Sequence, residues 1–156
     1  MIKVNTLINL LKKNNTNFFT GVPDSVLKQL SSSLQSVNKK NHIIATGYNG
    51  NPSGFIHCIN KPCQGANSPQ GEDLDKCEAI HAEQNALLQC KNVYEIDRVY
   101  TTLEPCVHCT KLLLNTSANQ IIYGEKYVHD LSRKLWESSG RGYTYINLNY
   151  LIRKTN

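Results

Sequence analysis

The stretch RVYTTLEPCVHCTKLLL, residues 98–114, joins two patterns that together decide the fold. Its first six residues, RVYTTL, are rich in β-branched and aromatic side chains, which predicts a buried strand. Pro105 suits the first turn of a helix, where a missing N–H costs nothing, and the apolar residues up to Leu114 predict a helix from about Cys106. A strand that leads directly into a helix is typical of α/β proteins.

The same alternation of strands and helices extends to both sides of this stretch. It implies crossover connections and a sheet that is covered by helices. Residues 49–75 are rich in Gly, Pro, Asn and Ser and predict one long loop, of a length that is usually functional or disordered. The expected strands are Phe18-Phe19, 42–48, 119–124 and 143–148, and the other expected helices lie near 7–11, 26–34, 78–89 and 130–138.

Length, charge and cysteine content narrow the class of protein. A chain of 156 residues is sufficient for one compact domain, and its net charge of +5 weakly favours an anionic partner such as a nucleotide. The opening residues MIKVNTLINLLKKNN are interrupted by Lys and Asn, so we expect neither a signal peptide nor a membrane span. We therefore expect a reducing cytoplasm, where six cysteines serve metal binding or chemistry more often than disulfides.

Three residues from two predicted helices form a candidate zinc site. Cys106 and Cys109 stand three apart on one helical turn, so both sulfurs project to the same side. His81, at the start of the preceding helix, can supply a third ligand, and three protein ligands are the number typical of catalytic zinc. Glu83 would then lie near the metal without binding it, where a carboxylate can carry protons between water and substrate.

Each of these motifs has a plainer interpretation when it is taken alone. His-x-Glu at the start of a helix is most often a solvated turn, and a Cys-x-x-Cys pair can serve redox chemistry. His108 is expected to point away from the two cysteines. The combination of both motifs, in this order and with a strand between them, is what favours the zinc site, and it is the signature of zinc-dependent deaminases.

Residues 43–127 resemble the deoxycytidylate deaminases of the cytidine deaminase superfamily. The similarity rests on TGYNGNPSGFIHC (46–58), IHAEQNAL (80–87) and VYTTLEPCVHCTKLLL (99–114). Free-nucleoside cytidine deaminases usually have Cys in place of His81, and tRNA adenosine deaminases lack a GYNGxPxG block. The resemblance implies a three-layer α/β fold, with a mixed central sheet and helices on both faces.

The resemblance also implies an activity and further site residues. The reaction would be hydrolytic deamination of dCMP to dUMP with release of ammonia, with zinc as cofactor and Glu83 as proton carrier. Asn49 would bind the sugar and Tyr127 would lie close to the phosphate, although on their own they equally suit a turn and a packing position. A second, structural zinc would use ligands from the long loop, which could also be free thiols and a surface histidine: His57, Cys58, Cys63 and Cys77.

The N-terminal segment departs from this family. Members usually begin with a helix and a strand like VGAVIV, whereas LKKNNTNFFTGVPDSVLKQLSSSL (11–34) and NHIIA (41–45) resemble the start of a phosphonopyruvate or sulfopyruvate decarboxylase. We therefore divide the chain into an atypical helical segment (1–45) and a deaminase domain (46–156). Either Phe18-Phe19 or part of 31–40 replaces the usual first strand, or the chain is a joined fragment with impaired stability or activity.

Two other functions remain open from the sequence. The same chemistry could act on a tRNA base, with the positive charge holding phosphates, or the zinc could be structural in a module that only binds nucleotide. The leading hypothesis is an enzyme that takes a small pyrimidine deoxynucleotide, has no nucleic-acid or membrane partner, and forms a homo-oligomer as its relatives commonly do.

Overall fold

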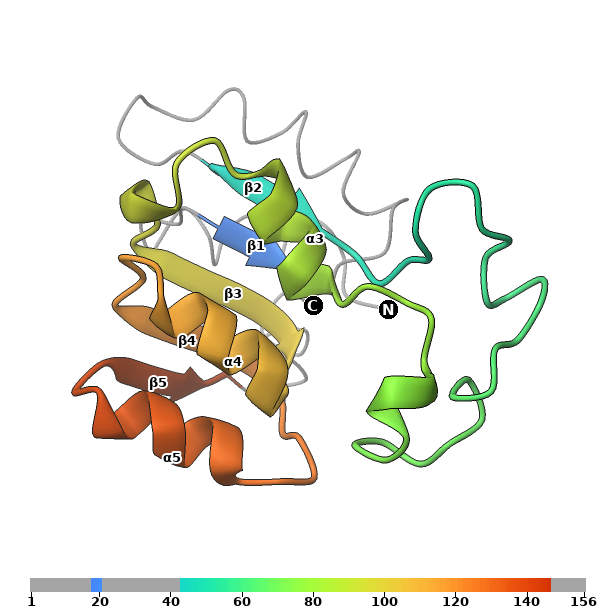
Figure 1. The fold of residues 1–156 in the computed structure, drawn as a ribbon. Helices are drawn as coiled ribbons and strands as arrows, with labels where there is room; N and C mark the ends of the chain where they lie inside the picture. The colour runs from blue at the N-terminus through green and yellow to red at the C-terminus, as the bar shows by residue number, and fades with distance from the viewer. Residues whose placement is uncertain (1–17, 21–42, 147–156) are drawn as a thin grey trace, which may run out of the picture.

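The described part of the protein contains a five-stranded parallel sheet. The computed structural model describes residues 18–20 and 43–146, and its strands are arranged in the order β2-β1-β3-β4-β5 (Figure 1). Each neighbouring pair runs parallel. The strands are β1 (Phe18–Thr20), β2 (Ala45–Gly47), β3 (Arg98–Leu103), β4 (Gln120–Glu125) and β5 (Gly142–Tyr145).

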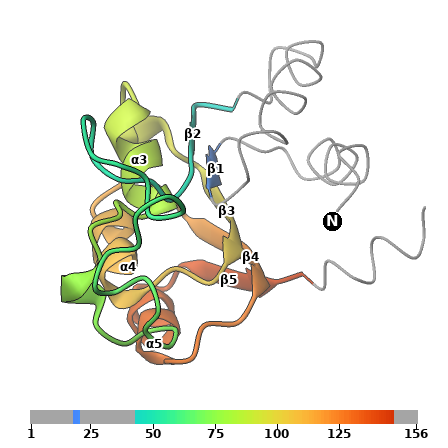
Figure 2. The same cartoon turned by 90° about the vertical axis from the view of Figure 1, so that its right-hand side faces the viewer.

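The three described α-helices cover one face of this sheet. Figure 2 shows them on the same side, with the loop that precedes α3 passing in front of them. α3 packs on β2 and β1, and α4 packs beside α5. The helices are α3 (Ala82–Gln89), α4 (Val107–Leu114) and α5 (Leu131–Ser138), and two single 3₁₀ turns occur at η1 (Leu74–Lys76) and η2 (Val93–Glu95).

The hydrophobic core lies between the helices and strands β3 and β4. Val99 and Ile121 point into it from the sheet, and Leu113 and Trp136 meet them from α4 and α5, all four fully buried. The Trp136 indole also donates a hydrogen bond to the carbonyl oxygen of Gly142 at 2.7 Å, so its polar atom is satisfied inside the core. This packing holds β3 and α4 in place on the two sides of the turn that joins them.

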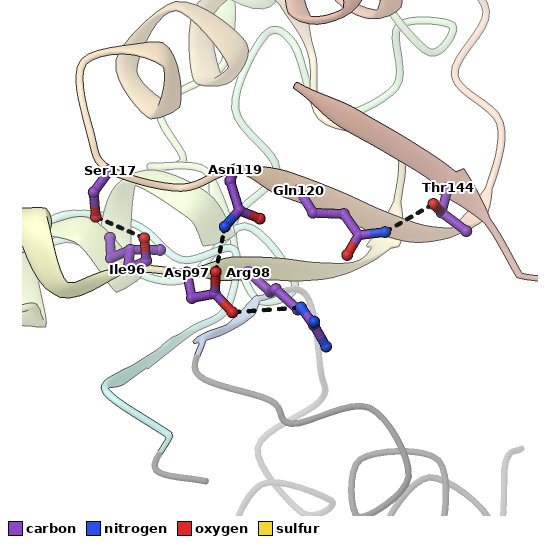
Figure 3. Close-up of polar contacts among 7 residues, drawn as sticks. All are labelled: Ile96, Asp97, Arg98, Ser117, Asn119, Gln120 and Thr144. Carbon is purple, nitrogen blue, oxygen red and sulfur yellow. Dashed lines mark hydrogen bonds and ion pairs between the residues drawn. The ribbon is translucent and has the colours of Figure 1, made fainter. Parts of the chain in front are cut away.

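Polar contacts join the beginnings of β3, β4 and β5, at the end of the sheet opposite that turn (Figure 3). Ser117 donates to the carbonyl oxygen of Ile96 at 2.7 Å, and the Asn119 amide donates to the Asp97 carboxylate. Gln120 donates to the Thr144 hydroxyl at 3.0 Å. These contacts add to the backbone hydrogen bonds at the same end of the sheet, in which the Asn119 N–H donates to the Asp97 carbonyl oxygen and the Gly142 N–H to that of Asn119.

The predicted fold is confirmed in class and differs in detail. The α/β fold and the strand at Phe18-Phe19 are present, and β1 fills the place between β2 and β3. The sheet, which we expected to be mixed, is parallel in all described pairings. The predicted helices near 7–11 and 26–34 lie outside the described residues, so helices on the second face remain a prediction.

Two boundaries also differ from the prediction. The third helix begins at Ala82 rather than near Glu78, because Ile80 is held extended by an antiparallel bridge with Gly50. The expected division of the chain at residue 45 falls inside β2, and it stays a prediction. No α-helix within 18–20 and 43–146 has the length and hydrophobicity to cross a bilayer.

Candidate metal centre

The turn after β3 presents two buried cysteines at the start of α4. Cys106 is the N-cap residue of the helix and Cys109 lies on its first turn. Their side chains are 4% and 0% exposed, and neither forms a disulfide. The spacing of three residues places both sulfurs on one side of the helix, as the sequence predicted. His108, between them, is exposed to solvent, also as predicted.

The first residue before α3 brings a third ligand to these sulfurs. His81 is the N-cap of α3, and its Nδ1 lies 3.4 Å from Cys106 Sγ and 3.5 Å from Cys109 Sγ. The three candidate ligand atoms all lie within 4.8 Å of one another. Among the described residues this is the one group of three or more His, Cys, Asp or Glu side chains that meets this criterion.

The separation of these atoms fits a tetrahedral zinc ion. Zinc bonds to sulfur at about 2.3 Å and to nitrogen at about 2.0–2.1 Å, which puts the two ligand atoms about 3.6 Å apart at the tetrahedral angle. The observed distances of 3.4 and 3.5 Å are close to this value. One imidazole and two thiols are donors that zinc takes in proteins, and three protein ligands are the number typical of a catalytic site.

The electrostatics of the three groups also favour a bound cation. A hydrogen bond with Cys109, opposed by burial and reinforced by His81, lowers the pKa of Cys106 to about 4. The same hydrogen bond with Cys106, together with burial, raises the pKa of Cys109. Contact with the Cys106 sulfur raises the pKa of His81. The pKa shifts of the two sulfurs are opposite in direction, and a divalent cation bound between them would stabilise both as thiolates.

Glu83 is a buried carboxylate beside this cluster. It lies on the first turn of α3, is 8% exposed and is within hydrogen-bond reach of Cys109. Burial raises the pKa of Glu83 above the value of an exposed carboxyl group. A carboxyl group in this setting keeps its proton to a higher pH than an exposed one, which is the direction that the proton-carrier hypothesis requires.

Asn49 connects the strand β2 to the same helix. Its side-chain oxygen accepts a hydrogen bond from the backbone N–H of Ala82 at 2.8 Å. Asn85 makes the reciprocal contact, because its amide donates to the carbonyl oxygen of Tyr48 at 2.8 Å. Because the Asn49 side-chain oxygen already accepts this hydrogen bond, the NH₂ group of Asn49 is the part of the amide that can donate to a substrate.

A glycine makes the close contact of β2 and α3 possible. A Cβ atom on Gly47 would lie 2.0 Å from the carbonyl oxygen of Ala82 and 2.5 Å from the backbone nitrogen of Ala86. No side chain can be accommodated at these distances from backbone atoms. The absence of a side chain at Gly47 therefore lets the residues of the GYNG segment approach the start of α3.

Tyr127 lies on the loop between β4 and α5, where Cys106, Cys109 and Glu83 act on its phenol. It is half-buried in a run of otherwise exposed residues, 125–130. Burial raises the pKa of its phenol, and the electrostatic effect of Cys106, Cys109 and Glu83 raises it further. This position is compatible with the predicted contact to substrate, which stays a prediction.

The second predicted metal site is only partly assembled. The Cys58 and Cys63 sulfurs lie 3.7 Å apart, and Cys77 is within hydrogen-bond reach of Cys63. Cys58 also contacts the Asn51 oxygen at 2.9 Å, and the His57 ring accepts a hydrogen bond from the backbone of the long loop. Both sequence-based alternatives, a structural zinc and free thiols, therefore stay open.

One supporting residue was missed in the sequence. The Gln84 side chain accepts a hydrogen bond from the backbone N–H of His81 at 2.9 Å, which holds the ligand at the helix start. Gln three residues after an N-cap is the pattern of a capping box, and this signal could have identified it. It was overlooked because the N-cap itself is a histidine rather than Ser, Thr, Asp or Asn.

Comparison with protein families places the centre in a known context. Residues 35–125 match the family described as "Cytidine and deoxycytidylate deaminase zinc-binding region". The deoxycytidylate deaminase of Saccharomyces cerevisiae is 33% identical over 90 residues, which are 56% of this chain and 29% of that protein. ComE operon protein 2 of Bacillus subtilis is 31% identical over 133 residues, 82% of this chain and 66% of that protein. The chain thus spans less than two thirds of either relative.

Solved structures support the fold. The dCMP deaminase from the cyanophage S-TIM5 in apo form has a TM-score of 0.52 and 20% identity, and the match covers 80% of this chain and all of that chain. The same protein in complex with dCMP and dUMP has a TM-score of 0.52 and 21% identity, covering 80% of this chain and 99% of that one. At this level of identity the likeness is evidence for a common fold.

Proposed function

The chain belongs to the cytidine and deoxycytidylate deaminase zinc-binding family, and we propose that it catalyses the hydrolytic deamination of dCMP to dUMP. The observation that carries this proposal is the convergence of His81, Cys106 and Cys109 on one point beside the buried carboxyl group of Glu83. Relatives from yeast and phage that carry the name deoxycytidylate deaminase favour the mononucleotide as substrate.

His81, Cys106 and Cys109 would hold the zinc ion, for which their donor atoms have the required separation. Zinc bound there supplies a Lewis acid that allows water to lose a proton near neutral pH. Glu83 takes that proton and delivers it to ring nitrogen N3 while the water oxygen attacks C4 of the cytosine. Glu83 then takes the second proton of that water from the oxygen now bonded to C4 and passes it to the C4 amine, which leaves as ammonia, so that one water is consumed and dUMP is formed.

The other residues of the site bind and orient the nucleotide. Asn49, whose oxygen is fixed on Ala82, would donate its NH₂ group to a sugar oxygen. Tyr127 would close the pocket on the side of the β4–α5 loop. Burial of Cys106, Cys109 and Glu83, with His81 half-buried beside them, would limit the access of bulk water to the protons that this reaction moves.

The test is ammonia release from dCMP by the zinc-loaded protein, with Glu83→Gln beside the wild type. We expect the wild type to turn over dCMP, and Glu83→Gln to lose at least about a hundredfold in kcat while it retains zinc. Cytidine and a tRNA are assayed in parallel. Turnover of tRNA but not of dCMP would favour the polynucleotide alternative, and zinc binding without any turnover would favour a binding module.

Two further expectations belong to this proposal. We infer that the protein acts in the cytoplasm and forms a homo-oligomer. The absence of a membrane-spanning helix from the described residues is compatible with the first, and the exposed apolar residues Leu88, Tyr94 and Leu112 on the helical side are compatible with the second.

A further inference from the structure

Glu104 is a buried carboxylate for which the chemistry proposed above has no use. Within the described residues, Glu83 and Glu104 are the two acidic side chains that are buried, and Glu104 is 4% exposed. A carboxylate in such a place loses its hydration and is stable only if polar groups replace the water. The partners of Glu104 therefore indicate what the side chain does.

The backbone of Tyr127 donates to the Glu104 carboxylate, and the Tyr143 phenol, whose pKa burial raises, lies close enough for the carboxyl group to raise that pKa further. Oε2 of Glu104 accepts a hydrogen bond from the Tyr127 N–H at 2.7 Å, across 23 residues of sequence. The N–H of Glu104 donates to the carbonyl oxygen of Glu125 at 2.8 Å. Backbone and side chain of the same residue thus both hold the segment that leaves β4.

The position of Glu104 in the chain connects this segment to the metal ligands. Pro105 follows it directly and has a fixed φ, and Cys106 is the next residue. The ligand turn and the carboxylate are therefore parts of one short, stiff piece of backbone. A displacement of the β4–α5 loop relative to Cys106 would have to break the bond between Glu104 and Tyr127.

The loop held in this way also meets the long loop that precedes α3. Tyr127 is half-buried, whereas the other residues of 125–130 are exposed. The centroid of its ring lies 6.1 Å from that of the His129 ring. Residues 128 and 129 meet the long loop, because a Cβ atom on Gly71 would lie 2.8 Å from Val128 and 2.9 Å from His129. Three segments distant in sequence, the ligand turn, the β4–α5 loop and the long loop, thus converge near Tyr127.

We propose that Glu104 is a positioning residue, which fixes the Tyr127 loop against the ligand turn so that the Tyr127 ring forms one wall of the nucleotide pocket. This inference rests on the proposed function for its kinetic consequence, and on the hydrogen bond alone for its structural one. Glu104 touches neither the metal ligands' donor atoms nor the reacting atoms, and its effect on substrate passes through Tyr127.

The test compares Glu104→Ala with Glu104→Gln in the full-length, zinc-loaded protein. The amide oxygen of Gln can accept the same hydrogen bond, whereas Ala removes the acceptor. We expect Glu104→Ala to raise KM for dCMP by about tenfold with kcat changed by less than about threefold, and Glu104→Gln to restore KM to within about threefold of the wild type. Zinc content should be equal in all three proteins.

Hydrogen exchange at the Tyr127 amide supplies a measurement that does not depend on activity. We expect exchange in the peptide that contains Tyr127 to be at least about tenfold faster in Glu104→Ala than in the wild type, and near the wild-type rate in Glu104→Gln. Glu125→Ala is the matched control, since it removes an exposed carboxylate from the last residue of β4 while the backbone carbonyl that binds the Glu104 N–H stays in place, and it should change neither exchange nor KM.

The outcomes separate this inference from the proposed function. If neither the wild type nor any variant turns over dCMP, the proposed function fails. The hydrogen-exchange data then still decide whether Glu104 holds the loop. Unchanged exchange at Tyr127 in Glu104→Ala overturns the inference. So does a KM in Glu104→Gln as high as in Glu104→Ala, or failure of Glu104→Gln to fold, since the acceptor alone would then not account for the role.

Discussion

Replacement of Gly47 by alanine tests whether the contact of β2 with α3 is as close as the structure indicates. The added Cβ would lie 2.0 Å from the carbonyl oxygen of Ala82, 2.5 Å from the backbone nitrogen of Ala86 and 2.9 Å from its Cβ. Two of these three atoms belong to the helix backbone, so no rotamer change can relieve the overlap. The helix and the strand must move apart.

The cost of this movement can be bounded. Overpacking of a core typically costs about 1–3 kcal/mol, and contacts with backbone atoms belong at the upper end of that range. We therefore expect Gly47→Ala to lose about 3 kcal/mol of the free energy of unfolding, out of a total of about 5–15 kcal/mol. For a chain of this size that corresponds to a melting temperature roughly 6–12 °C lower.

The assay is urea denaturation followed by circular dichroism, with Gly50→Ala as the matched control. A Cβ atom on Gly50 would meet only the Tyr48 ring, at 3.4 and 3.7 Å, which is ordinary van der Waals contact. We expect this control to stay within about 1 kcal/mol of the wild type. A Gly47→Ala protein as stable as Gly50→Ala would show that β2 and α3 do not pack as closely as described, and the placement of Asn49 against α3 would be lost with it.

Three further predictions concern the ligands and the assembly. Cys106→Ser should lose the zinc of the catalytic centre by elemental analysis, and a second equivalent that disappears only in Cys63→Ser would establish the loop site. Asn49→Ala should destabilise the protein by about 1 kcal/mol in urea denaturation, because the Ala82 N–H loses its cap, and should also raise KM for dCMP. Light scattering should give a mass of at least two chains, and a mass of one chain would contradict the homo-oligomer.

The parts of the fold that were predicted correctly are those that local sequence determines. The sequence predicts both ends of the strand at 98–103 and the end of the helix at Leu114, while the helix starts at Val107, one residue later than expected. These ends are predictable because hydrophobic pattern and Pro105 both act within a few residues. The two cysteine ligands were also predictable, because a spacing of three residues places the Cys106 and Cys109 side chains on the same side of one helical turn. Their distance to His81 could only be inferred from the motif.

The contacts that sequence could not reveal join residues that lie far apart. The bond from Tyr127 to Glu104 spans 23 residues and the bond from Ala82 to Asn49 spans 33. No periodicity or propensity encodes such a pair, because each partner satisfies its local structure equally well without the other. For the same reason Gly47 looks like an ordinary strand residue until the helix above it is placed.

The unusual N-terminal segment affects the sheet without disturbing the residues of the metal centre. β1 pairs in parallel with both β2 and β3, and parallel neighbours require a crossover connection of a dozen or more residues, for which 21–44 is long enough. His81 depends on the contact of α3 with β2, and Cys106 and Cys109 depend on β3 and α4. What the site requires of the segment before it is therefore a strand in this position, and FFT supplies one from outside residues 35–125, which match the deaminase family.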